Sequence, residues 1–188
     1  MTVTAELRTV LICYDGSDRA QHAIAVTATL FPGARAHVLN VWEPMERIVA
    51  RYSALGPYLG EGIGEADAGI QREATELAAA GAKLAGDAGL EATPYSVALR
   101  TTVWEAVVHA ANELDVDAII TGTRSLHGVR EALSNTLSHA LLQHSERPVL
   151  AIPTVASPSA DLSSGRAAAR SAIAAGALLL WYKLGIPN

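Results

Sequence analysis

The chain has 188 residues, half of them apolar, which is enough to bury a sizeable core in one domain that carries an appendage. Its formal net charge of -5 excludes non-specific nucleic-acid binding through a basic surface, because contacts to the phosphate backbone need clustered lysine and arginine. The single cysteine, Cys13, excludes an intrachain disulfide, and its place in the apolar run VLICY predicts a buried, inert thiol.

The first half of the chain alternates short apolar runs with helical patterns. Residues 10–14 predict a strand that ends in an Asp-Gly-Ser turn, and apolar positions at helical spacing follow over residues 20–30. Residues 36–42 predict a second strand. The Pro- and Gly-punctuated segment 43–64 is expected to be a loop, and an Ala-rich helix is predicted at about 65–88.

The pattern continues with a third predicted strand at residues 91–99. Thr102, with Glu105 three residues later, forms a capping-box pattern that starts a helix running to about Leu114. Residues 117–121 predict the fourth strand.

The last two elements are a helix at residues 136–144 and a fifth strand at residues 148–152, from Pro148 to Ile152. Apolar strands separated by helices predict an α/β fold, a doubly wound five-stranded parallel sheet with helices on both faces. Ligands bind such sheets outside the carboxyl ends of the strands, where the winding reverses. Asp15 and Gly122 are both predicted to lie at such ends.

The loop after the fourth strand has features of a phosphate site. Asn135, Thr136 and Leu137 supply a helix N-terminus, whose free N–H groups and dipole attract phosphate. Gly122 has no side chain to obstruct a phosphate, and the hydroxyls of Ser125 and Thr136 can donate to its oxygens. An ordinary loop with Asn135 as a structural N-cap is the alternative.

Two charged residues near these ends also have alternative roles. Arg124 can pair with a phosphate or be a solvated surface charge. Asp15 can accept from a ligand or cap the helix that begins near Ser17.

The order of elements, the opening run VLICYDGSDRA and the closing run TGTRSLHGVREALSNTLSHALLQHSERPVLAIP resemble the universal stress protein family over about residues 5–153. Nucleotide-binding members of that family have Gly, two residues, Gly, nine residues, Gly and then Ser or Thr after the fourth strand. This chain has Gly122, Ser125, Asn135 and Thr136 at those spacings. One glycine and the hydroxyl residue therefore match, while small polar residues replace two glycines.

The resemblance implies an adenine nucleotide alpha hydrolase-like fold that binds ATP or a related adenine nucleotide. It places Asp15 beside the ribose and adenine, and the backbone of Val41 at the adenine edge. Whether Mg²⁺ accompanies the nucleotide stays open.

The leading hypothesis is a cytoplasmic, nucleotide-responsive binding module of the stress response, not a turnover enzyme. The alternatives are a module that binds no nucleotide and acts through dimerisation or partner contacts, and an enzyme that cleaves ATP. No G-x-S-x-G elbow, P-loop or metal-binding histidine set is present in the sequence, and the N-terminus lacks the pattern of a secretory signal.

Two further expectations concern assembly and the tail. An open apolar edge strand invites pairing, and members of the resembling family bury this edge, so we expect a homodimer through residues 148–152. The domain is predicted to span residues 1–153, with a linker at 154–164 and an apolar helix or loose tail at 165–188. The apolar run at 172–182 is too short to span a bilayer, so no transmembrane span is expected.

Overall fold

A computed structural model describes residues 8–51, 63–124 and 137–154 of the chain. The elements in chain order are β1 (Thr9–Cys13), α1 (Asp18–Leu30), β2 (Arg35–Trp42), α2 (Met45–Arg51), α3 (Ile63–Asp87), β3 (Glu91–Ala98), α4 (Val103–Glu113), β4 (Ala118–Arg124), α5 (Leu137–His144) and β5 (Val149–Thr154). The five strands form one parallel sheet in the order β3-β2-β1-β4-β5. The predicted doubly wound α/β fold is therefore confirmed.

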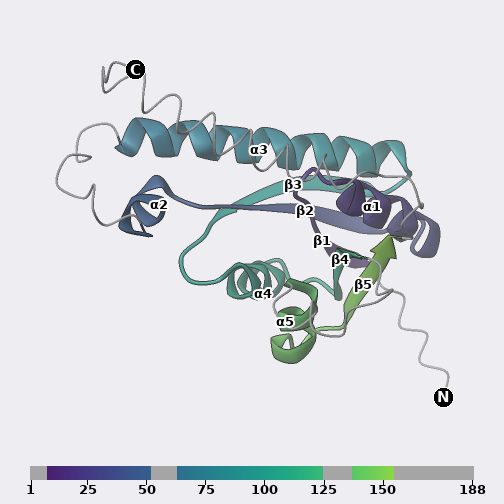
Figure 1. The fold of residues 1–188 in the computed structure, drawn as a ribbon. Coiled ribbons are helices and arrows are strands. Elements are labelled where there is room, and N and C mark those ends of the chain that lie inside the picture. The colour runs from purple at the N-terminus through teal and green to yellow at the C-terminus, as the bar shows by residue number, and fades with distance from the viewer. Residues whose placement is uncertain (1–7, 52–62, 125–136, 155–188) are drawn as a thin grey trace. The chain divides into compact units, whose positions relative to one another are not determined.

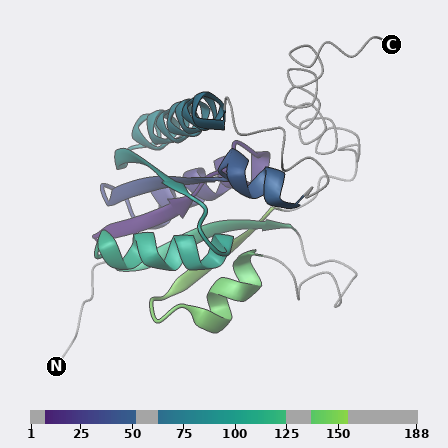
Figure 2. The ribbon, with the colours of Figure 1, turned by 90° about the vertical axis from the view of Figure 1, so that its left-hand side faces the viewer.

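The sheet is covered on both faces, as Figure 1 and the turned view of Figure 2 show. Helices α1 and α3 pack on one face against Val10, Ile12 and other buried strand residues. Helices α4 and α5 pack on the other face against Leu11 and its neighbours. Because alternate residues of a strand face opposite sides, a strand buried on both faces must be apolar throughout, and the run VLIC of β1 meets this requirement.

Local sequence signals set several boundaries as expected. Thr102 caps α4, and its hydroxyl accepts from the N–H of Glu105, whose carboxylate accepts from the N–H of Thr102. The predicted capping box is therefore confirmed. Ser17 caps α1 by accepting from the N–H of Ala20.

The segment after β2 differs from the expectation of a loop, because it contains helix α2. Arg47 of this helix donates to the carbonyl oxygens of Arg100 and Thr101, and the N–H of Met45 donates to the Asp67 carboxylate over 2.6 Å. These bonds join α2 to the loop after β3 and to α3. Partners distant in the sequence thus stabilise a helix of only 7 residues, too short to be stable by itself.

The fourth strand is longer than expected. It was predicted to end at residue 121 and instead continues to Arg124, because Gly122, Thr123 and Arg124 pair with Ile152, Pro153 and Thr154 of β5. Gly122 therefore lies inside a strand. The predicted tail at 165–188 and all of the predicted linker except Thr154, which ends β5, lie outside the described residues.

Arg147 anchors the start of β5 at the amino-terminal end of the sheet, opposite the carboxyl ends of the strands. Its guanidinium donates to Asn112 Oδ1 over 3.1 Å, to Asp115 Oδ1 over 3.0 Å and to the Val116 carbonyl oxygen. Asp115 lies in a tight turn between α4 and β4 and has a positive φ of 46°. Because the arginine binds Asp115, it also stabilises this turn.

Candidate functional site at the carboxyl ends of the strands

The candidate site lies where the direction of winding changes. From β1 the chain builds outward through β2 and β3 to one edge, and it then returns to add β4 and β5 on the other side of β1. The switch point is therefore between the carboxyl ends of β1 and β4, the place where ligands bind in folds of this kind.

The strand register brings three predicted site residues to this end of the sheet. Cys13, the last residue of β1, pairs with Leu39 of β2; Asp15 follows two residues after Cys13, and Val41 two residues after Leu39. Ile12 pairs with Ile120, the last pairing between β1 and β4, and Gly122 lies two residues further along β4.

Val41 lies on β2, two residues beyond Leu39, the last residue of β2 that pairs with β1. The carbonyl oxygen of Leu39 accepts from the N–H of Tyr14 over 2.8 Å, so Leu39 directs its backbone groups toward β1. Val41, two residues later, directs its own backbone groups to the same side, past the end of β1. Its side chain packs in the core beneath α4, so it is the backbone that faces the switch point.

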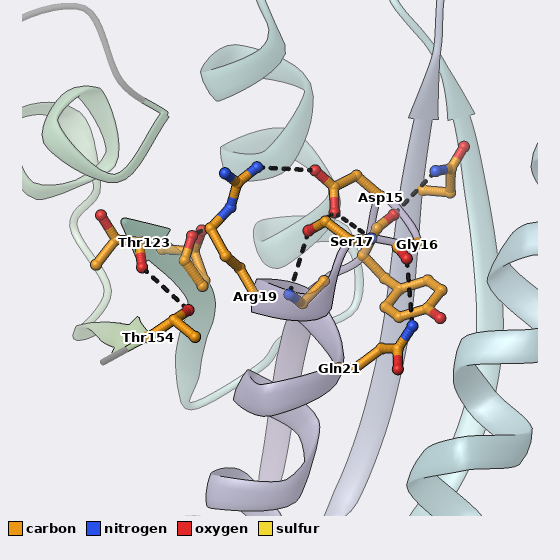
Figure 3. A network of polar contacts seen from close by, with 12 residues as sticks. Asp15, Gly16, Ser17, Arg19, Gln21, Thr123 and Thr154 are labelled. Atoms are coloured by element: carbon orange, nitrogen blue, oxygen red, sulfur yellow. Dashed lines mark hydrogen bonds and ion pairs between the residues drawn. The ribbon is translucent and has the colours of Figure 1, made fainter. Parts of the chain in front are cut away.

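Asp15 is held in a tight turn at the start of α1. Its Oδ1 accepts from the Ser17 N–H over 3.0 Å and from the Ser17 hydroxyl (Figure 3). Gly16 has a φ of 77°, a left-handed conformation that glycine adopts without strain. The cap of α1 is Ser17, and Asp15 orients it from outside the helix through Oδ1, so Oδ2 takes part in neither of these bonds.

Arg19 is the basic residue nearest to Asp15 in the described part of the chain. Its Nη2 lies 3.8 Å from Asp15 Oδ2, and the two side chains are 33% and 65% exposed. Figure 3 shows the arginine rising from α1 toward Asp15, on the side where Thr123 lies. A cation in the first turn of a helix opposes the helix dipole, so the sequence contains a signal for Arg19 that the sequence-based prediction missed.

Gly122 has a structural reason to be glycine. A Cβ built on it would lie 2.5 Å from the carbonyl oxygen of Arg19 and 2.7 Å from its carbonyl carbon. The missing side chain therefore lets the first turn of α1 pack directly on β4. This differs from the sequence interpretation, in which the space was kept for an incoming phosphate.

Asn40 is a second residue that the sequence analysis missed. It is 8% exposed, and its Nδ2 donates to the Tyr14 carbonyl oxygen over 2.9 Å. This bond connects β2 to the residue before Asp15. The signal was the polar residue inside the otherwise apolar strand AHVLNVW, because a buried amide needs a hydrogen-bond partner.

The remaining predicted site residues belong to the segment between β4 and α5. Ser125, Asn135 and Thr136 lie outside the described residues, and of Arg124 only the backbone, at the end of β4, is described. Leu137 begins α5 and packs against the core on the α4 side of the sheet.

Cys13 lies directly before this turn. Burial, and then the negative charge of Asp15, raise the pKa of its thiol from 9.0 to about 12. A raised pKa means that the thiol stays protonated at neutral pH, in agreement with the inert thiol expected from the sequence, but Cys13 is half-buried and not fully buried as predicted.

We expect Cys13 to react with a thiol reagent at about pH 8 roughly a thousandfold more slowly in the folded protein than in denaturant, because three pKa units separate the two thiolate populations. Absorbance of the released chromophore measures both rates. Asp15→Asn should speed the reaction of the folded protein, since it removes the second cause of the shift. Equal rates in folded and unfolded protein would contradict this expectation.

Two other classes of feature are absent from the described residues. Within residues 8–51, 63–124 and 137–154, no three or more His, Cys, Asp or Glu side chains are grouped so that they could hold a metal ion. In the same ranges, no helix has the length and apolar character that crossing a membrane requires.

Comparison with known proteins identifies the family. A model of the universal stress protein family matches residues 6–153. No curated protein matches the chain significantly.

Several solved structures share the fold. Protein MJ0577 is 20% identical, with a TM-score of 0.59 over 81% of this chain and 100% of that one. A universal stress family protein from Burkholderia pseudomallei is 19% identical, with a TM-score of 0.55 over 80% and 98%. An Arabidopsis thaliana protein of the family, with AMP bound, is 13% identical, with a TM-score of 0.53 over 82% and 97%. Because the family model matches most of its length, this chain belongs to the universal stress protein family.

Proposed function

We propose that the chain binds an adenine nucleotide, ATP or a close relative, at the switch point between β1 and β4. The observation that carries the proposal is that Asp15 follows the end of β1 while the Val41 backbone, on the neighbouring strand β2, faces past the end of β1 at the switch point. The family membership supports it, as does the AMP bound to the Arabidopsis thaliana protein of similar fold.

Each residue has a distinct part in the proposed complex. Asp15 Oδ2 accepts from a ribose hydroxyl, while Oδ1 stays bonded to Ser17. The Val41 backbone meets the polar edge of adenine. The phosphates lie beyond the end of β4, toward Leu137 at the start of α5, where the segment that contains Ser125, Asn135 and Thr136 joins the two elements.

The N-terminus of α5 and the loop hydroxyls suit the phosphates because donors and dipole point in the same direction. Arg124 is proposed to contribute a positive charge to the same phosphates. Mg²⁺ would accompany a triphosphate as its counter-ion, through phosphate oxygens.

We further propose that the protein binds the nucleotide without turning it over and acts as a cytoplasmic regulatory module in stress. In this proposal Asp15, whose Oδ1 accepts two bonds from Ser17, serves only as an acceptor for the ribose. The chain has a single cysteine and so no intrachain disulfide, which suits a reducing cytoplasm. Cell fractionation tests the location, and recovery in a membrane or exported fraction would contradict it.

Titration calorimetry with ATP and AMP, run beside an assay of phosphate release, tests the proposed function. Binding without phosphate release is the expected result. Absence of binding would favour a module that acts through protein contacts alone, and binding with release would favour an enzyme that cleaves ATP.

A homodimer through β5 is a second part of the proposal. The N–H of Ile119 donates to the Pro148 carbonyl oxygen over 2.9 Å, and Ile119 is in register with Val149. Backbone groups of alternate residues in a strand face opposite sides, so Val149 and Ala151 direct theirs away from β4. Pro153, the next outward residue, has no N–H, which limits pairing to the Val149–Ala151 stretch.

We expect Ala151→Pro to convert the dimer to a monomer, because it removes an outward N–H while the bonds to β4 are retained. Light scattering after gel filtration measures the mass. Leu150 is a poorer probe, since its side chain packs against the core. Leu142→Lys serves as control, because Leu142 is 60% exposed on α5 and lies outside the edge ladder. If Ala151→Pro remains dimeric and Leu142→Lys becomes monomeric, the interface is on α5.

A further inference from the structure

Arg19 is placed at the switch point by the packing of its own backbone. Its carbonyl oxygen lies only 2.5 Å from the point that a Cβ of Gly122 would occupy, so the first turn of α1 cannot move away from β4 without opening a gap in the core. The α-carbon of Arg19 is thereby fixed between the end of β1, which carries Asp15, and the end of β4, which carries Thr123.

The side chain of Arg19 is held far more weakly than its backbone. Its ion pair with Asp15 is 3.8 Å long, and both groups are partly solvated. Pairs of this kind contribute little to stability, because water already solvates both charges and ordering two side chains costs entropy. The helix dipole also disfavours a cation at this position. The guanidinium is therefore available to a stronger anionic partner at little cost.

We propose that Arg19 changes partner when the nucleotide binds, from Asp15 in the free protein to a phosphate of the ligand, and that this exchange makes the site selective for nucleotides over nucleosides. The inference rests on the proposed function and assigns to that site a residue that the phosphate loop does not contain. Arginine suits this role because its planar fork donates two parallel bonds to a phosphate.

The exchange couples the two halves of the ligand through Asp15. In the free protein, Asp15 Oδ2 faces the guanidinium, and the same oxygen is the proposed ribose acceptor. A phosphate that attracts Arg19 releases Oδ2 for the ribose, so both contacts form together. A nucleoside has no phosphate, so it makes no contact with Arg19, and it must also displace the guanidinium from Asp15 at a small cost.

The test compares the affinities of AMP and adenosine by calorimetry for the unmodified protein and for Arg19→Ala. We expect Arg19→Ala to weaken AMP binding by about tenfold to a hundredfold, the range for losing a hydrogen-bonded charge. Adenosine binding should stay unchanged or become tighter, because Asp15 loses its competitor. Opposite or unequal effects on the two ligands are the signature of the exchange.

Two further variants separate this role from general effects of charge and folding. Arg35→Ala removes the same charge from the start of β2, at the other end of the sheet, and should leave the ratio of the two affinities unchanged. Arg19→Lys retains the charge without the fork and should restore part of the AMP affinity. Thermal unfolding of each variant checks that α1 is still docked.

The possible results distinguish the inference from the proposed function. If Arg19→Ala weakens AMP and adenosine equally, or leaves AMP unaffected, Arg19 is no phosphate contact, and nucleotide binding by the other residues stands. If the unmodified protein binds neither AMP nor adenosine, the proposed function and this inference are both overturned.

Discussion

Gly122→Val is expected to destabilise the protein by about 3 kcal/mol or more, at the upper end of what overpacking costs. The reason is that the first atom of any side chain at this position would lie 2.5 Å from the Arg19 carbonyl oxygen and 3.1 Å from the Arg19 Cβ. Helix α1 would have to move away from β4, and the contact that places Arg19 beside Asp15 would be lost with it. Urea denaturation measures the change in the free energy of unfolding.

Two glycine replacements serve as comparisons for this variant. Gly122→Ala should also destabilise, but less, because a methyl group lacks the branches of valine. Gly86→Ala in α3 should be neutral or slightly stabilising, because a Cβ there meets nothing within 4 Å and alanine favours the helix. If Gly122→Val retains the stability of the unmodified protein and loses only nucleotide binding, then Gly122 serves the phosphate, as the sequence first indicated.

Asp15→Ala is expected to weaken the binding of adenine nucleotides by about tenfold to a hundredfold, since a charged acceptor for a ribose hydroxyl is removed. Stability should fall by only about 1 kcal/mol or less, because Ser17 still caps α1 through its bond to the Ala20 N–H. Unlike the change at Arg19, this variant should weaken adenosine as well as AMP. Calorimetry with both ligands measures the two effects.

Asp18→Ala is the matched control for Asp15→Ala. Asp18 carries the same charge in the first turn of the same helix, and its loss should leave nucleotide affinity close to that of the unmodified protein. Equal losses in the two variants would indicate that only the local charge matters. An unchanged affinity in Asp15→Ala would place the ribose elsewhere.

The sequence determined the fold because its signals are local or periodic. A strand buried on both faces must be apolar throughout, as VLIC is in β1, and the alternation of such strands with helices leaves a parallel sheet as the simplest arrangement. The capping box at Thr102 is local in the same way, since both of its hydrogen bonds lie within four residues.

The elements that the sequence misjudged depend on distant partners. Helix α2 is stabilised by Arg47 bonds to the loop after β3, 53 and 54 residues away. The last residues of β4 are a strand because β5 pairs with them. No window of neighbouring residues contains either partner, so a pattern within the window cannot reveal them.

The candidate site also combines residues that local sequence predicts with contacts that depend on distant partners. Asp15 and Ser17 follow from a short turn motif, and the sequence by itself placed Asp15 at the end of a strand and Ser17 near the start of a helix. Only the tertiary structure showed that the backbone of Arg19 packs against Gly122, because the packing of α1 across β4 brings the two residues together. The same packing carries the Arg19 side chain to Asp15 at the switch point, where a cation disfavoured by its own helix is available to an anionic ligand.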